Sequence, residues 1–129
     1  MALKYSEEVK KNFMHPKNLG KIKNPDGFGE VGNPLCGDVM QLYIKVKDKK
    51  DKKIISDIKF KAFGCAAAIA SSSMITQLAK NKELNEAKKI ELKDIAKSLK
   101  GLPPIKMHCA NMVTQALKKA IEDYEKNEK

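Results

Sequence analysis

Apolar side chains occupy every second position from residue 39 to 47, which is the period of a half-buried strand. Residues 54–63 predict a second strand of the same kind. The predicted apolar faces are Met40, Leu42, Ile44 and Val46 in the first strand and Ile58, Phe60 and Ala62 in the second. A charged turn over residues 48–53 separates the two strands, so we expect them to pair as a hairpin.

Sequence patterns typical of helices lie before and after this hairpin. Ser6 has the character of an N-cap for a short helix that ends near Met14, because His15-Pro16 follows. Further helices are predicted over residues 66–80, 81–87 and 91–100, and a long amphipathic helix follows Pro103-Pro104. The apolar stripe of that last helix is Cys109, Met112, Val113, Ala116, Leu117, Ala120, Ile121 and Tyr124.

The region between the first helix and the hairpin has a different composition. Residues 18–32 are rich in Gly, Asn, Pro and Lys, which favours a connector or a sheet edge over a core element. We therefore expect one domain over residues 1–129, in which residues 1–32 form an N-terminal helix and a mobile connector.

Charge and composition narrow the classes of partner. The formal net charge is +10, and all 26 basic residues are lysine. Readers of nucleic acid usually depend on the planar fork of arginine, so nucleic-acid binding is not expected, whereas an acidic protein partner fits the charge. An odd number of cysteines and the lack of a long apolar run argue against secretion and membrane insertion, and a reducing cytoplasm is the expected location.

Three cysteines, Cys36, Cys65 and Cys109, carry the candidate chemistry. Cys65 and Cys109 both fall near predicted helix starts, where the thiolate form is stabilised. Thiolates bind soft metal ions and iron-sulfur clusters, and Asp38 or His108 could supply a fourth ligand. The spacing matches no zinc finger, and each cysteine taken alone is equally consistent with a small core residue.

The residues around the cysteines resemble the three signatures of the IscU/NifU-type scaffold family. The runs that carry the resemblance are Cys36-Gly37-Asp38-Val39-Met40, Gly64-Cys65 followed by residues 68–73, and Leu102-Pro103-Pro104-Ile105-Lys106-Met107-His108-Cys109. Residues 5–9 and 16–20 also resemble the start of that family, so the similarity covers nearly the whole chain.

The resemblance implies a fold and a chemistry. The fold is α+β, with a small antiparallel sheet of about three strands covered by helices and the three cysteines at one end. In such scaffolds a cysteine desulfurase delivers persulfide sulfur, iron is added, and a [2Fe-2S] cluster forms and passes to recipient apoproteins. By position, Cys36, Cys65 and Cys109 would be the thiolate ligands, Asp38 or His108 would complete the set, and Cys109 would be the favoured persulfide acceptor.

Other roles follow from the same resemblance or from the chemistry of the ligands. Residues Leu102 to Lys106 resemble the segment that an Hsp70-type chaperone grips, and the two prolines predict an extended conformation there. Lys106 could stabilise a thiolate or the cluster, or lie in solvent. A carboxylate is a poor ligand for a soft cluster, so our hypothesis is that Asp38 is the exchangeable ligand. His108 is the alternative ligand, and it could equally be a hydrogen-bond donor behind the ligands.

Two other classes of function compete with the scaffold. A zinc-binding persulfide acceptor would use the same residues to hold Zn²⁺, although the zinc-dependent branch of the family carries an insertion between its second and third cysteines that this chain lacks. A cysteine hydrolase would need His108 as a base, but we expect the side chains of sequence neighbours near a helix start to diverge. A scaffold that is not an enzyme is therefore favoured. Assembly of the chain into a homo-oligomer is a further alternative.

Overall fold

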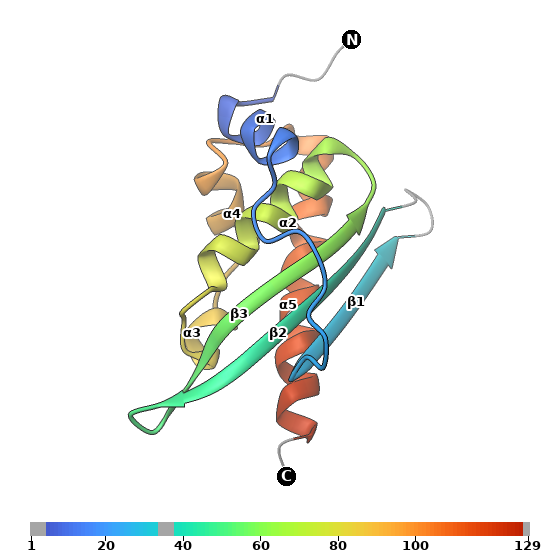
Figure 1. Cartoon of the computed structure of the whole chain (residues 1–129). Coiled ribbons are helices and arrows are strands. Elements are labelled where there is room, and N and C mark those ends of the chain that lie inside the picture. Colours follow the sequence, from blue (N-terminus) through green and yellow to red (C-terminus); the bar gives the residue numbers. More distant parts are fainter. Residues whose placement is uncertain (1–4, 34–37, 128–129) are drawn as a thin grey trace.

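Three antiparallel strands form a sheet whose one face carries the helices (Figure 1). The computed structural model describes residues 5–33 and 38–127. The strands lie in the order β1 (Gly27–Asn33), β2 (Asp38–Lys49) and β3 (Lys52–Phe63). This arrangement confirms the predicted α+β fold with a small antiparallel sheet.

The hairpin of β2 and β3 is longer than the sequence pattern predicts. Lys49 pairs with Lys52, so the turn consists of Lys50 and Asp51 alone and not of residues 48–53. Both turn residues have left-handed backbone angles, with φ of 51° and 66°, which suits a two-residue turn matched to the twist of the strands. The sequence pattern could not reveal the additional strand residues, because exposed ends of long strands carry charged side chains and no apolar alternation.

The predicted connector divides into two parts. Its second half is the edge strand β1, which pairs with β2 from Gly27 opposite Ile44 to Asn33 opposite Asp38. Its first half runs along the free edge of β3, where the Gly20 amide donates to the Phe60 carbonyl and the Phe60 amide donates to the Asn18 carbonyl. Both alternatives from the sequence, a connector and a sheet edge, are therefore present.

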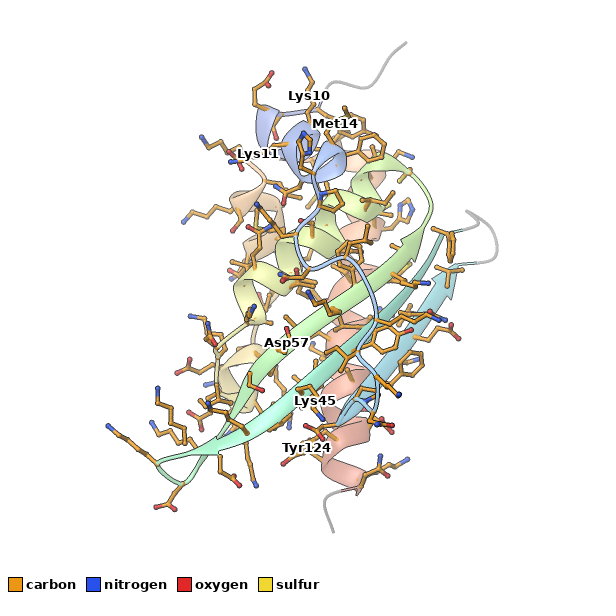
Figure 2. The ribbon with its side chains drawn as sticks, in the orientation of Figure 1. Lys10, Lys11, Met14, Lys45, Asp57 and Tyr124 are labelled. Atoms are coloured by element: carbon orange, nitrogen blue, oxygen red, sulfur yellow. The ribbon has the colours of Figure 1, made fainter. Side chains whose placement is uncertain are left out.

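After leaving the β3 edge, the connector crosses to β1 over the face of the sheet that the helices leave uncovered (Figure 1). Lys45 fixes its far end, because the Lys45 Nζ atom donates to the Asn24 carbonyl at 3.0 Å and lies 3.6 Å from Asp26 Oδ1. Figure 2 shows Lys45 near Asp57, its partner on β3. The connector is thus tied to the sheet at both ends.

The helices follow the predicted order with shorter bounds. They are α1 (Glu7–Met14), α2 (Ala66–Ala79), α3 (Leu84–Ala87), α4 (Leu92–Ser98) and α5 (Met107–Asn127), with a 3₁₀ turn, η1 (Pro104–Lys106), before α5. The prediction of a helix from residue 81 is wrong at its start, because Asn81 has a φ of 69° that a helix does not allow. No helix in the described part of the chain has the length and apolarity needed to cross a membrane.

Helix α2 is buried on nearly every side, and most of its buried residues are small. Ser71, Ser72, Ser73 and Thr76 are all inaccessible to solvent, as expected for small side chains that permit close packing. Ser73 Oγ donates to Asn12 Oδ1 at 2.7 Å, which fixes α1 against α2. Buried hydrogen bonds of this kind are costly to leave unpaired, so they define how the N-terminal helix docks.

Helix α5 packs directly on β1. A Cβ atom on Gly27 would lie 2.2 Å from the Ala120 carbonyl oxygen, and one on Gly29 would lie 2.3 Å from the Ala116 carbonyl oxygen. The whole predicted apolar stripe of α5 is buried, which confirms its amphipathic pattern. The absence of side chains at these two glycines therefore lets the helix backbone approach the strand backbone.

A Gly29→Ala substitution should destabilise the protein by about 2–3 kcal/mol, because the added methyl group meets helix backbone, which cannot rotate away. The free energy of unfolding from urea denaturation measures the effect. Glu30→Ala, on the exposed neighbour in β1, is the matched control and should change stability by less than about 0.5 kcal/mol. Equal stability of the two variants would contradict the packing described.

Candidate functional site

Cys65 lies where β3 gives way to α2. Phe63 ends the strand, Gly64 has a φ of 149° that favours glycine, and Cys65 is the N-cap of α2. The Cys65 carbonyl accepts the amides of Ala68 and Ile69, which starts the helix. The predicted helix-start position is confirmed, and the residue is partly exposed.

Cys109 lies in the first turn of α5, directly after the η1 turn. Its solvent accessibility is 0%. The sequence pattern placed this residue at the end of the buried stripe, and the structure confirms that position. The two cysteines therefore differ in access although both begin helices.

The two thiols meet in space. The Sγ atoms of Cys65 and Cys109 are 3.5 Å apart, although 44 positions separate the residues in the chain. A disulfide bond is about 2.05 Å long, so this is a non-bonded contact. Two thiolates on one tetrahedral ion, each about 2.3 Å from the metal, would lie about 3.8 Å apart. The observed spacing fits two ligands of a single soft metal ion.

His108 also reaches this pair. Its Nε2 atom lies 3.5 Å from Cys109 Sγ. The expectation that the two neighbouring side chains diverge is therefore wrong. The imidazole begins in the first helical turn and is long enough to bend round it toward the thiol. His108 is itself exposed, so it borders the site on its solvent side.

Cys36 lies outside the described residues, as does the side chain of Asp38. The backbone on either side of the segment is described. Asn33 and Asp38 are partners in the β1–β2 pairing, and Val39 is the partner of Phe63, two positions before Cys65. The chain thus enters and leaves the segment that contains Cys36 at the end of the sheet where Cys65 lies.

Within the described residues, no group of three or more His, Cys, Asp or Glu side chains is placed to hold a metal ion. The described part of the predicted ligand set is the Cys65 and Cys109 pair with His108 beside it. The other predicted ligands, Cys36 and the Asp38 carboxylate, are not among the groups that the structure describes.

The segment from Leu102 to Lys106 is not extended throughout. Pro103 has extended backbone angles, with φ of −55° and ψ of 138°. Residues Pro104–Lys106 then turn into η1, because the Lys106 amide donates to the Pro103 carbonyl at 2.8 Å. The prediction that both prolines hold the segment straight is therefore wrong for its second half. Lys106 is half-buried at the start of α5.

One exposed apolar residue near the thiols was not singled out from the sequence. Phe63 is 66% exposed and lies two positions before Cys65. A signal was available, because Phe63 falls outside the alternating apolar face formed by Ile58, Phe60 and Ala62.

The structure is a small α+β domain with two thiols in contact at one end of its sheet. A sequence profile described as "NifU-like N terminal domain" matches residues 4–129. The chain therefore belongs to the NifU-like N-terminal domain family, as the sequence motifs indicated.

Relatives of the family align with nearly the whole of this sequence. "Iron-sulfur cluster assembly scaffold protein IscU 1" of Archaeoglobus fulgidus is 55% identical over 120 residues, which cover 93% of this chain and 76% of the relative. The IscU scaffold protein of Escherichia coli is 49% identical over 123 residues, which cover 93% of each chain. That of Aquifex aeolicus is 44% identical over 124 residues, which cover 96% of this chain and 78% of the relative.

Solved structures show the same fold. A Fervidobacterium islandicum protein described as an iron-sulfur cluster assembly scaffold for the SUF system superimposes with a TM-score of 0.71 at 25% identity. The match covers 91% of this chain and 96% of that one. A NifU-like N-terminal protein of Brucella abortus gives a TM-score of 0.68 at 16% identity, with 93% of each chain covered, which supports the fold alone.

The spacing of Cys65 and Cys109 predicts that they chelate one soft ion together. In a Cys36→Ser background, replacing either remaining cysteine by serine should weaken Cd²⁺ binding by roughly a hundredfold, because the second thiolate then no longer binds intramolecularly. Titration of the cadmium–thiolate ultraviolet band measures this affinity. Ala66→Ser, made in the same background, keeps both thiols and should bind as the parent does. Single-thiol proteins that bind as tightly as the two-thiol parent would contradict the prediction.

Proposed function

We propose that this protein is a non-enzymatic scaffold on which a [2Fe-2S] cluster is built and from which it passes to recipient apoproteins. The observation that carries the proposal is the 3.5 Å contact between the thiols of Cys65 and Cys109, which come from distant parts of the chain. Such a contact at one end of the sheet is what a soft-metal ligand pair requires. The family relatives named as IscU scaffolds support the same function.

The cluster is the cargo of this site, and the donor set suits it. Thiolates of Cys36, Cys65 and Cys109 are proposed as three ligands, since iron-sulfur clusters are held mainly by cysteine thiolates. A permanent electron-transfer cluster normally has four such ligands or two histidines on one iron. Three thiolates and one harder ligand therefore favour a cluster that is held long enough to assemble and can still be released.

Asp38 or His108 is the proposed fourth ligand. The 3.5 Å approach of His108 Nε2 to Cys109 Sγ supports a role for the imidazole at the site, as a ligand or as a donor behind the ligands. Asp38 begins β2, adjacent to the segment that contains Cys36. We retain Asp38 as the exchangeable ligand, because a carboxylate oxygen is the weaker match for a soft cluster and gives way more easily to an incoming thiolate.

The proposed reaction needs partners. A cysteine desulfurase would supply sulfur as a persulfide, with Cys109 as the favoured persulfide acceptor, and recipient apoproteins would take the finished cluster. The Leu102–Lys106 segment is a proposed contact for an Hsp70-type chaperone, and Lys106 could offset the negative charge of the cluster. Assembly as a homo-oligomer and a cytoplasmic location stay predictions.

A zinc-binding persulfide acceptor is the competing outcome, because the spacing of the two thiols suits Zn²⁺ as well as iron. Anaerobic reconstitution with ferrous iron and inorganic sulfide separates the two functions. We expect visible charge-transfer bands with about equal iron and sulfide per chain, since such colour requires iron–sulfur bonds. A protein that stays colourless and retains one tightly bound zinc would overturn the scaffold proposal in favour of the zinc-binding acceptor.

Asp38→Cys should lengthen the half-life of the reconstituted cluster severalfold, because a fourth thiolate replaces the exchangeable oxygen ligand. Loss of visible absorbance in the presence of a chelator measures the half-life. Asp48→Cys is the matched control, since Asp48 lies at the far end of β2 in an ion pair with Lys53. A half-life unchanged by Asp38→Cys and altered by His108→Ala would assign the fourth ligand to His108 instead.

A further inference from the structure

Two lysines of the β2–β3 hairpin carry positive charge that nothing nearby neutralises. Val46 packs against the core, so the next residue, Lys47, points to the face of the sheet without helices, and Lys49 follows on that face. Both lysines are exposed, and within the described residues no ion pair joins either of them to a carboxylate. The carboxylate of Asp48 lies between them in sequence but belongs to the other face, where it binds Lys53 at 2.6 Å.

These two lysines line a hollow of about 250 Å³. The other side chains in its lining are Ile54, Ser56 and Asn81. Ile54 is the partner of Lys47 across the hairpin, and Asn81 lies along the edge of β3, because its amide donates to the Ile55 carbonyl. The described lining therefore combines one apolar side chain, a hydroxyl, an amide and two ammonium groups, with no carboxylate among them.

A second hollow beside the same hairpin shows that this composition is not general. It lies between the hairpin turn and the helices and also has a volume of about 250 Å³. Its lining includes Lys52 and Lys53 together with the carboxylates of Asp51, Glu83 and Glu125. Charges of both signs are mixed there, whereas the hollow on the helix-free face carries positive charge alone. An anionic partner is therefore attracted to the helix-free side of the hairpin.

The side chains around the hollow favour an acidic polypeptide as that partner. The chain contains no arginine, so the planar, bidentate contact to phosphate that nucleic-acid binders favour is not available. Alternate residues of a strand lie about 6.7 Å apart, and Lys47 and Lys49 present two ammonium groups at that interval. An extended polypeptide presents alternate side chains at the same interval, so its carboxylates can meet both lysines at once. Ile54, half-buried beside Lys47, offers contact to an apolar side chain of the same segment.

We propose that the hollow on the helix-free face of the hairpin is a docking site for an acidic segment of a partner protein. Carboxylates of the segment bind Lys47 and Lys49, and an apolar side chain between them packs on Ile54. The proposal does not depend on the scaffold function, because none of these residues belongs to the thiol site.

The position of the hollow leaves the thiols accessible. Val39 pairs with Phe63 at the thiol end of the sheet, and Lys49 lies ten positions further along β2, which corresponds to roughly 33 Å of strand. Figure 1 shows the hairpin turn at the end of the sheet opposite the start of α2. A partner held at the hairpin would therefore not cover Cys65, and a second protein could approach the thiols at the same time.

The test uses the full chain and a rhodamine-labelled peptide of sequence Glu-Glu-Glu-Leu-Glu-Glu-Glu, whose binding is followed by fluorescence anisotropy at low salt. Lys47→Glu combined with Lys49→Glu should weaken binding by about tenfold or more, because attraction becomes repulsion. Lys93→Glu combined with Lys118→Glu is the matched control. It changes the net charge equally at exposed positions of α4 and α5 and should weaken binding by less than about twofold, since distant surface charges are screened.

A second comparison tests the apolar contact. Ile54→Ala should weaken binding of the leucine peptide severalfold and should leave binding of the same peptide with alanine in place of leucine nearly unchanged, because only the leucine side chain packs on Ile54. Circular dichroism checks that each variant is folded. If the double lysine-to-glutamate variant of the hairpin is not folded, Lys47→Gln combined with Lys49→Gln replaces it.

Equal weakening by the two charge-reversal variants would overturn the proposal, because net charge alone would then explain the binding. Failure of the leucine peptide to bind, or binding that Ile54→Ala leaves unchanged, would also overturn it. A single-stranded DNA of 20 nucleotides and vesicles of phosphatidylglycerol are tested in the same buffer. Tighter binding of either one, lost when Lys47 and Lys49 are reversed, would reject the acidic polypeptide in favour of that partner.

Discussion

The site depends on one packing constraint, the close approach of α5 to β1. At Gly27 and Gly29 the helix backbone lies where side chains would otherwise be, so the middle of α5 is held directly against β1. The first turn of α5 carries Cys109, and the position of that turn is therefore set by the contact with the strand. Helix α2 packs on both β3 and α5 and brings Cys65 to the same place. A helix held at a greater distance would separate the two sulfur atoms.

Two helix starts meet at that end of the sheet, where the backbone that flanks the Cys36 segment also lies. The β3–α2 junction contributes Cys65, the η1–α5 junction contributes Cys109 and His108, and the β1–β2 connection contains Cys36. The two described thiols thus belong to different junctions, each beside a rigid element. A metal bound here would join separate parts of the chain. The proposed cluster could then be held with little rearrangement of the core and released by exchange of a single ligand.

The chemistry of α2 explains how the same end can be both well packed and reactive. Ser72, Ser73 and Thr76 are buried and hydrogen-bonded to backbone or to α1, which fixes the helix without large side chains. Its N-terminus nevertheless reaches the surface at Cys65, while Cys109 lies beneath it. The site therefore has an exposed and a protected thiol in contact, an asymmetry that follows from where the two helices begin.

The sequence by itself determined the elements, the apolar faces and the identity of the candidate ligands, because alternation, helical stripes and the cysteine motifs are local signals. It also placed Cys65 and Cys109 at helix starts. The sequence did not predict the full length of the hairpin, because the exposed strand ends around Lys50 and Asp51 carry only charged residues. The approach of His108 to Cys109, the turn at Pro104–Lys106 and the 3.5 Å contact of two thiols 44 positions apart were decided by tertiary structure. These features depend on how helices seat against a sheet, and no local pattern of residues encodes a distance between elements.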